Sequence, residues 1–371
     1  MLLRLIEEGG KMNAHKVPTT YYKGWKADGY KNSFYIFYKD NIDKDGVLKS
    51  YKKSDKITKE HSYFMEKDFY IIDFTIEGIE YKLKNEITEF LELSGYKINC
   101  PDNLSEEESP EKVNIDSYDD FMYYYEDINL WCISDSTGGK VSVDTFIKKL
   151  NNNIFTKVGE IIEHDYFACY LEPKWNNVKK SLQEDINLLK SNDNIIISNK
   201  KDFLEFVVVQ YFRLDKRMED IKLALKSVES IFQSIGISEK DLKRNNLTSP
   251  KVYFYGLLLD AARGNKKKIL SQMDKLDKNY SIDILEAPTG VYYLTSTNPL
   301  VISKKIDDKI EEMLFPVNNR LCARFKIKKF PGECGKYDKQ IKSEVLRINR
   351  IIIKESEKIV MSNQKNIVSM L

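Results

Sequence analysis

Apolar residues recur at alternating intervals of four and three positions along residues 199–233, which is the pattern of a helix with one buried side. Asn199 is placed to cap the start of this helix, and Asp202 puts a carboxylate in its first turn. Residues 203–209 are apolar nearly all round. We therefore expect one long helix whose first two turns are enclosed. The stripe consists of Val207, Tyr211, Leu214, Met218, Ile221, Leu225, Val228 and Phe232.

A second stripe at helical spacing borders the first and contains Gln210, Arg213 and Arg217. Gln210 and Arg213 lie where the enclosed part of the helix ends. Side chains at such a position could form the rim of a pocket. Arginine is suited to a bidentate grip on phosphate or carboxylate. It is equally suited to tying the helix to neighbouring carboxylates or carbonyls, so the pattern leaves a binding role and a structural role open.

The hydrophobic period changes to two at both ends of the chain, which predicts strands there and helices between them. The fold class expected is α+β: short strands in the N-terminal and C-terminal parts around a largely helical middle. Strands are expected at 34–38, 63–64, 69–72, 130–133, 282–285, 291–294, 299–302 and 321–327. Helices are expected at 76–93, 118–125 and 339–357, and residues 142–191 are expected to be largely helical with a break at Pro173.

Residues 101–114 are acidic and bounded by prolines, and they predict the one connector between parts of the chain. Residues 12–100 would then form a β-rich part with a helix. Residues 115–371 would hold the helical core, the C-terminal strands and a basic helix, in one compact unit with 12–100.

The first eleven residues are expected to be a non-native extension. Residues 6–12, which read Ile-Glu-Glu-Gly-Gly-Lys-Met, are what a ribosome-binding site and a start codon give when they are translated in frame. Met12 is therefore the start that we expect.

The formal charge of +2 conceals a strong asymmetry along the 371 residues. Residues 101–130 hold ten acidic residues and one lysine, whereas residues 320–358 hold twelve basic and five acidic residues. The basic region favours a polyanionic partner such as nucleic acid, and a solvated helix face is the alternative.

Cysteine and histidine usage bounds the compartment and the metal chemistry. The five cysteines are dispersed and form no CxxC pair, which indicates a reducing compartment and argues against a zinc site or a disulfide framework. The chain has only three histidines, which argues against a histidine-rich metal site. The sequence has no apolar run of membrane-spanning length and no signal-peptide core, so a cytoplasmic protein is expected. Abundant Lys, Asn and Ile point to an AT-rich bacterial or phage genome.

Polar residues that could take part in catalysis or binding occur in three further places. His15 precedes a group of aromatics near the N-terminus and is a candidate general acid or base. Ser296 and Asn298 lie in a polar segment, residues 295–299, which also fits a strand-ending turn. Asp165 with Glu172 and Lys174 imitates the carboxylate set of a nuclease that uses a divalent metal, although such triplets arise by chance in a chain rich in Glu and Lys.

Taken together, these motifs resemble the bacterial family catalogued as domain of unknown function 4238. The resemblance rests on short motifs that run from about residue 12 to the end of the chain: His15, Val17, Pro18, Tyr22, Trp25, Gln210, Arg213, Thr295, Ser296, Asn298, Pro299, Phe315, Pro316, Val317 and Asn349. The chain departs from the family pattern at Ala14, where the family has a first histidine, and at Thr297, where it has an aspartate. The resemblance implies that His15, Gln210, Arg213 and Asn298 surround one site.

Two functions follow as expectations. The first is an enzyme that acts on phosphodiesters, such as a nuclease or a toxin-like effector in bacterial defence. In it, His15, Arg213 and Asn298 would act in catalysis, and Gln210, Arg217 and Ser296 would bind substrate, with a divalent metal as the cofactor to test. The second is a non-catalytic sensor or binding module for an anionic ligand, a nucleic acid or a partner protein. The missing aspartate at Thr297 favours the second, and the sequence leaves the oligomeric state open.

Overall fold

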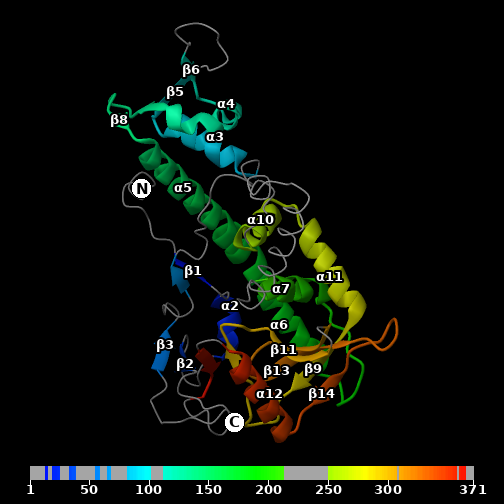
Figure 1. Ribbon diagram of the computed structural model, residues 1–371. Coiled ribbons are helices and arrows are strands. Elements are labelled where there is room, and N and C mark those ends of the chain that lie inside the picture. Colours follow the sequence, from blue (N-terminus) through cyan, green and yellow to red (C-terminus); the bar gives the residue numbers. More distant parts are fainter. Residues whose placement is uncertain are drawn as a thin grey trace. The chain divides into compact units, whose positions relative to one another are not determined.

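The computed structural model describes residues 13–15, 19–25, 33–38, 55–58, 65–67, 82–101, 112–212, 250–306, 309–356 and 359–364 (Figure 1). These residues belong to two compact units with separate cores. Unit 1 takes them from Tyr70–Ile162 and Lys222–Leu259. Unit 2 takes them from Asn13–Phe69, Glu163–Ile221 and Asp260–Leu371. Helices and several mostly antiparallel sheets occur together, so the α+β class expected from the sequence is confirmed.

Unit 1 is built on a four-stranded antiparallel sheet in the order β6-β5-β7-β8. The strands are β5 (Lys97–Pro101), β6 (Lys112–Asn114), β7 (Cys132–Ser134) and β8 (Lys140–Val141). The helices include α3 (Lys84–Leu93), α4 (Tyr118–Tyr123), a 3-10 helix (Tyr125–Leu130) and α5 (Val143–Glu160). The side chains of Ser117 and Ser142 cap α4 and α5 by accepting amide hydrogen bonds. Aromatic rings form the core, with Phe146 beside Phe90 and Trp131.

The acidic segment 101–114 does not separate two units of the structure. Strand β5 ends at Pro101, strand β6 begins at Lys112, and the two strands pair with each other. The segment therefore connects neighbouring strands of one sheet. Within the described residues, the two units divide at residues 162 and 163 and again at residues 259 and 260. Composition does not reveal these divisions, because the first falls inside a π-helix (Ile161–Leu171) and the second inside helix α10 (Pro250–Ala262).

Helical structure runs without a break from α5 through a π-helix (Ile161–Leu171) into α6 (Glu172–Ile186), so the break expected at Pro173 was wrong. Proline in a helix interior lacks an amide hydrogen and clashes with the carbonyl four residues earlier. Here that residue is Cys169, which lies in the π-helix. The carbonyls of a π-helix bond to amides five residues later, so the carbonyl of Cys169 does not need the hydrogen that Pro173 lacks.

Unit 2 contains a five-stranded sheet in the order β11-β12-β13-β9-β14. All its neighbouring strands are antiparallel except β14, which is parallel to β9. The strands are β9 (Tyr280–Glu286), β11 (Val301–Ile306), β12 (Lys309–Pro316), β13 (Leu321–Ile327) and β14 (Tyr337–Lys339). The predictions at 282–285 and 321–327 are confirmed by β9 and β13.

A second sheet of unit 2 joins strands from the two ends of the chain in the order β10-β15-β2-β3. These strands are β2 (Ser33–Tyr38), β3 (Asp55–Thr58), β10 (Thr295–Ser296) and β15 (Ile359–Ser362). A separate pair consists of β1 (Asn13–His15) and β4 (Met65–Lys67). The prediction at 34–38 is confirmed by β2, whereas residues 63–64 and 69–72 lie outside the described residues.

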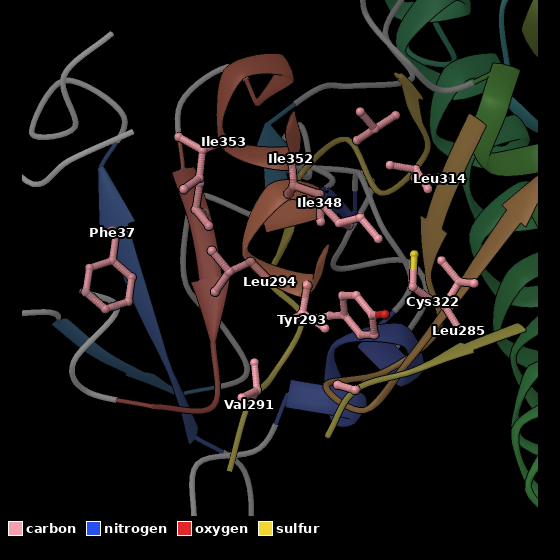
Figure 2. Packing of buried hydrophobic residues seen from close by; sticks show 14 residues of the cluster. Phe37, Leu285, Val291, Tyr293, Leu294, Leu314, Cys322, Ile348, Ile352 and Ile353 are labelled. Carbon is pink, nitrogen blue, oxygen red and sulfur yellow. The ribbon is translucent and has the colours of Figure 1, made fainter. Parts of the chain in front are cut away.

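Helices cover both faces of the five-stranded sheet. On one face lies α7 (Lys200–Phe212), where the ring of Phe203 stacks on Phe325 with centroids 6.0 Å apart. On the other lies α12 (Lys342–Glu355), whose Val345, Ile348 and Ile352 pack into a cluster with Leu285, Leu314 and Cys322 of the sheet (Figure 2). The sheet is therefore buried on both sides, and Phe37 of β2 and Val360 of β15 extend the α12 cluster. The remaining helices are α2 (Thr19–Tyr22), a 3-10 helix (Lys23–Trp25), α10 (Pro250–Ala262) and α11 (Lys267–Asn279).

Three local expectations differ from the structure. Residues 291–294 form no strand; Val291, Tyr293 and Leu294 are buried, and the side chain of Asn349 on α12 bonds to the amide of Leu294 and the carbonyl of Tyr292. Helix α12 begins at Lys342, so Ile341 precedes it and is 70% exposed. The side chain of Asn199 donates to Ser181, while its backbone carbonyl begins α7.

The enclosed start of the long helix is confirmed: every residue from Phe203 to Gln210 is buried in α7. Residues 213–233 of the predicted helix lie outside the described residues. The first eleven residues lie outside them too.

Candidate functional site

Tyr21 of α2 brings together three of the segments that carry the sequence motifs. Its hydroxyl donates to the carbonyl of Pro316 at 2.6 Å and shares a second hydrogen bond with the hydroxyl of Thr295 at 2.8 Å. Its ring stacks on Phe206 of α7 at 6.2 Å. The N-terminal aromatic segment, the helix that carries Gln210, and the polar segment that begins at Thr295 therefore meet in the core of unit 2.

The Tyr21 hydroxyl is a neutral group in this position. Burial raises the pKa of Tyr21 well above its usual value, and the hydrogen bond from Thr295 opposes this only in part. The hydroxyl therefore donates a structural hydrogen bond at neutral pH and is not a proton acceptor for a substrate.

An aromatic junction surrounds Tyr21, and we define it as Tyr21, Trp25, Trp175, Phe206 and Phe315. The rings of Trp175 and Phe206 stack at 4.1 Å, and Trp25 lies 4.9 Å from Tyr21. The indole nitrogen of Trp25 donates to the carbonyl of Tyr293 at 2.9 Å. Stacking and hydrogen bonds together fix α2, α6, α7 and the segment before β10 in one arrangement.

Two polar groups at the α7 side of the junction are buried without partners among the described residues. Gln210 is 1% exposed, and neither its amide nitrogen nor its amide oxygen has a hydrogen-bond partner. The indole nitrogen of Trp175 also has none. Gln210 lies one helical turn after Phe206 on the same side of α7. Buried polar groups in native proteins are nearly always bonded to protein, water or ligand, so this amide marks a candidate binding site in unit 2.

Ser296 is occupied by a local turn. Its hydroxyl donates to the carbonyl of Asn298 at 2.9 Å and accepts from the amide of Asn298 at 3.1 Å. This is the strand-ending turn that the sequence offered as one alternative, and it follows strand β10 directly. The turn leaves the side chain of Asn298 partly exposed.

The remaining predicted residues are not assembled by the described part of the structure. His15 ends strand β1, where its backbone lies opposite Met65, and the position of its side chain is outside what is described. Arg213 and Arg217 follow the described end of α7 and lie outside the described residues. The contacts of Tyr21 bring the segments of Gln210 and Ser296 together, but the side chain of Gln210 makes no hydrogen bond to Ser296 or Asn298.

A charged cluster on the opposite side of α7 was not predicted. Glu205, with a side chain that is 3% exposed, accepts a hydrogen bond from Tyr170 at 2.8 Å and lies 3.5 Å from the amine of Lys174 and 3.4 Å from that of Lys266. Lys174 also bonds to Asp202 at 2.6 Å, and Lys266 lies 3.1 Å above the ring centre of Tyr170. The signal in the sequence was a single glutamate within the apolar run of residues 203–209.

Charge in this cluster is balanced, with two carboxylates and two amines. Burial lowers the pKa of Lys174, but its hydrogen bonds to Asp202 and Tyr170 and the charge of Glu205 outweigh burial and raise the pKa above its usual value. Burial and the neighbouring Glu205 raise the pKa of Tyr166, which donates to Glu205. Lys174 thus pairs with Asp202 and Glu205, whereas Asp165 pairs with His164, so these contacts are not those of the nuclease-like carboxylate set.

No group of three or more His, Cys, Asp or Glu side chains is arranged to hold a metal ion in the parts of the chain that the structure describes. Within the same parts, no helix is both long and apolar enough to cross a membrane. The sequence matches no protein-family model, and no curated protein or solved structure matches it.

Proposed function

We propose that this protein binds an anionic ligand, a nucleotide or the end of a nucleic acid, at the Gln210 side of the aromatic junction. The observation that carries the proposal is the buried amide of Gln210, which has no partner among the described residues although Trp25 and Tyr21 in the same junction are fully bonded. An unpaired buried amide costs about 1–3 kcal/mol, which a ligand with complementary groups would offset.

The sequence that follows Gln210 suggests that the ligand is anionic. Arg213 and Arg217 stand three and seven positions after Gln210, which is one side of a helix at this spacing. Guanidinium groups bind phosphate through two parallel hydrogen bonds. The amide would thus orient the ligand, and the arginines would hold its charge.

Cleavage of phosphodiesters at the same place is the second candidate, as a nuclease or toxin-like effector in bacterial defence. It is supported by the position of His15, six residues before Tyr21, whose hydroxyl bonds to Thr295 beside Ser296. This second proposal rests in part on the resemblance to the family. In it, His15 moves a proton and Asn298 positions the substrate. Thr297 provides no carboxylate, and for this reason we place binding first.

The binding proposal is tested by fluorescence titration of the purified chain with mononucleotides, 5′-phosphorylated oligonucleotides and inorganic phosphate. Trp175 of the junction provides the signal. We expect saturable binding that Arg213→Ala weakens at least tenfold, since one lost charge-assisted pair costs about 1.5–3 kcal/mol. The matched control is Arg263→Ala, an exposed arginine that follows α10 and lies outside the basic region 320–358, and this variant should bind as the wild type does. Equal affinity of the two variants would refute the proposal.

The catalytic candidate is tested by incubation with labelled DNA and RNA, with and without Mg²⁺ or Mn²⁺. Turnover that is lost in both His15→Ala and Asn298→Ala would establish it. Saturable binding with no product from the wild type would leave the binding proposal and exclude this one.

A further inference from the structure

Cys169, His164 and Asp165 form a group on the exposed side of the π-helix. The thiol of Cys169 lies 3.8 Å from Nε2 of His164 and 3.9 Å from its Nδ1, and Nδ1 lies 2.8 Å from the carboxylate of Asp165. The side chains of His164 and Asp165 are 74% and 58% exposed, and Cys169 is exposed as well. A nucleophile, a base and a carboxylate that orients the base are thus adjacent and open to solvent.

The π-helix is the reason that these side chains meet. His164 and Cys169 are five positions apart, and at 3.6 residues per turn an α-helix would set them about 140° apart around its axis. A π-helix bonds each carbonyl to the amide five residues later, so positions five apart lie on the same side of the helix. In a regular α-helix, the same sequence would hold His164 and Cys169 apart.

The opposite side of the π-helix is anchored in the protein. Tyr166 and Tyr170 donate hydrogen bonds to Glu205 of α7, and Tyr166 is buried. This attachment holds the helical register that presents His164 and Cys169 outward. Chemistry at Cys169 therefore takes place on a fixed support and does not require the core to open.

We propose that Cys169 is a reactive thiol that exchanges with low-molecular-weight disulfides, a property beyond the binding function. His164 takes the proton of the Cys169 thiol, and Asp165 positions the imidazole. The thiolate attacks one sulfur of the disulfide, a new bond forms between Cys169 and that sulfur, and the disulfide bond breaks. The other half leaves as a thiolate and is protonated, so the low-molecular-weight disulfide is reduced to one thiol and Cys169 is oxidised to a mixed disulfide.

The other cysteines of the chain serve as internal controls. Cys132 and Cys334 are also exposed, but no histidine in the described part of the chain hydrogen-bonds to either thiol. Cys100 and Cys322 are buried and out of reach of a reagent. Exposure alone therefore predicts equal reaction of Cys132, Cys169 and Cys334, whereas the proposal predicts that Cys169 is faster.

The experiment is a time course of the reduced full chain with glutathione disulfide near neutral pH, quenched with acid and resolved by peptide mass spectrometry. We expect Cys169 to form the mixed disulfide about tenfold faster than Cys132 and Cys334, with release of one glutathione per modified thiol. In His164→Asn, Cys169 should fall to the rate of the two controls, while the controls stay unchanged. Asp165→Asn should slow Cys169 by about threefold through loss of the oriented imidazole.

A second measurement separates the folded geometry from the local sequence. In urea that unfolds the chain, the three thiols should react at similar rates, because the π-helical pairing is lost. Equal rates in the folded wild type, or a rate of Cys169 that His164→Asn leaves unchanged, would overturn the proposal. Both variants change exposed side chains, and circular dichroism verifies that they are folded.

Discussion

The side chain of Asn349 hydrogen-bonds to the backbone of residues 292–294, as the backbone of a neighbouring strand would. Its amide oxygen accepts from the amide of Leu294 and its amide nitrogen donates to the carbonyl of Tyr292, each at 2.9 Å. Asn349 is fully buried on α12 and Leu294 is buried too, so the amide of Leu294 depends on this side chain for its partner. One residue thus allows a segment that belongs to no strand to lie against the core.

Replacing Asn349 with Leu should lower the free energy of unfolding by about 2–4 kcal/mol, because the buried amide of Leu294 and the partly buried carbonyl of Tyr292 lose their partner. Urea denaturation of the full chain measures this. Arg350→Ala, at the next and exposed position, should change it by no more than about 0.5 kcal/mol. A loss in Asn349→Leu no larger than that of the control would show that the side chain does not have this role.

Replacing Gln210 with an apolar residue is expected to stabilise the protein, in contrast to the replacement of Asn349. Since its amide is buried without a partner, Gln210→Met should raise the free energy of unfolding by about 1 kcal/mol and weaken ligand binding. Gln340 is the matched control, because its amide nitrogen donates to Asp338 at 2.7 Å. Gln340→Met should destabilise the protein. Destabilisation by Gln210→Met, measured in the same urea series, would show that the amide has a partner.

At the scale of elements, periodic patterns were sufficient for long strands and helices and failed for short ones. Strand β13 alternates apolar and polar residues from Ala323 to Ile327, and α12 repeats Val345, Ile348 and Ile352, so both could be predicted. Strand β10 has two residues and β14 has three, which is too few to establish a period. The π-helix could not be predicted, because its residues read as an ordinary apolar helix. For the site, the sequence indicated that Gln210 differs from its apolar neighbours, but the contact of Tyr21 with Thr295 depends on tertiary folding.

Glu205 joins the π-helix, α6 and the segment before α11 to α7. Glu205→Leu should lower the free energy of unfolding by about 1–3 kcal/mol, since it leaves Lys174 and Lys266 without their shared carboxylate, and both amines are partly exposed. Glu205→Gln keeps an acceptor for Tyr170 and should lose less. Thermal and urea denaturation of both variants measure this order, and equal losses would show that the charge is unimportant.

At the scale of the whole molecule, the two units have separate aromatic cores that carry their own fluorophores. Trp131 packs against Phe121 in unit 1, and Trp25 and Trp175 are fully buried in unit 2. These are the three tryptophans of the chain. The unfolding of each unit can therefore be followed separately by tryptophan fluorescence emission.

We expect the two units to unfold in separate steps, as compact units with cores of their own do. The double variant Trp25→Phe, Trp175→Phe reports unit 1, and Trp131→Phe reports unit 2. Their urea midpoints should differ from each other, while circular dichroism of each variant shows both transitions. Coincident midpoints by all probes would show one cooperative unit.

The strand order of the second sheet determines when unit 2 can form during synthesis. Strand β2 lies between β3 and β15, and its paired residues in β15 come more than 320 positions later in the chain. At about 5–20 residues per second, the ribosome needs tens of seconds to deliver them. Until then the nascent chain keeps Phe34 and Ile36, which are buried in the folded protein, without their final cover. The second sheet of unit 2 thus cannot be completed until residues 359–362 have left the ribosome, and until then the emerging N-terminal aromatic segment is a natural client for a chaperone.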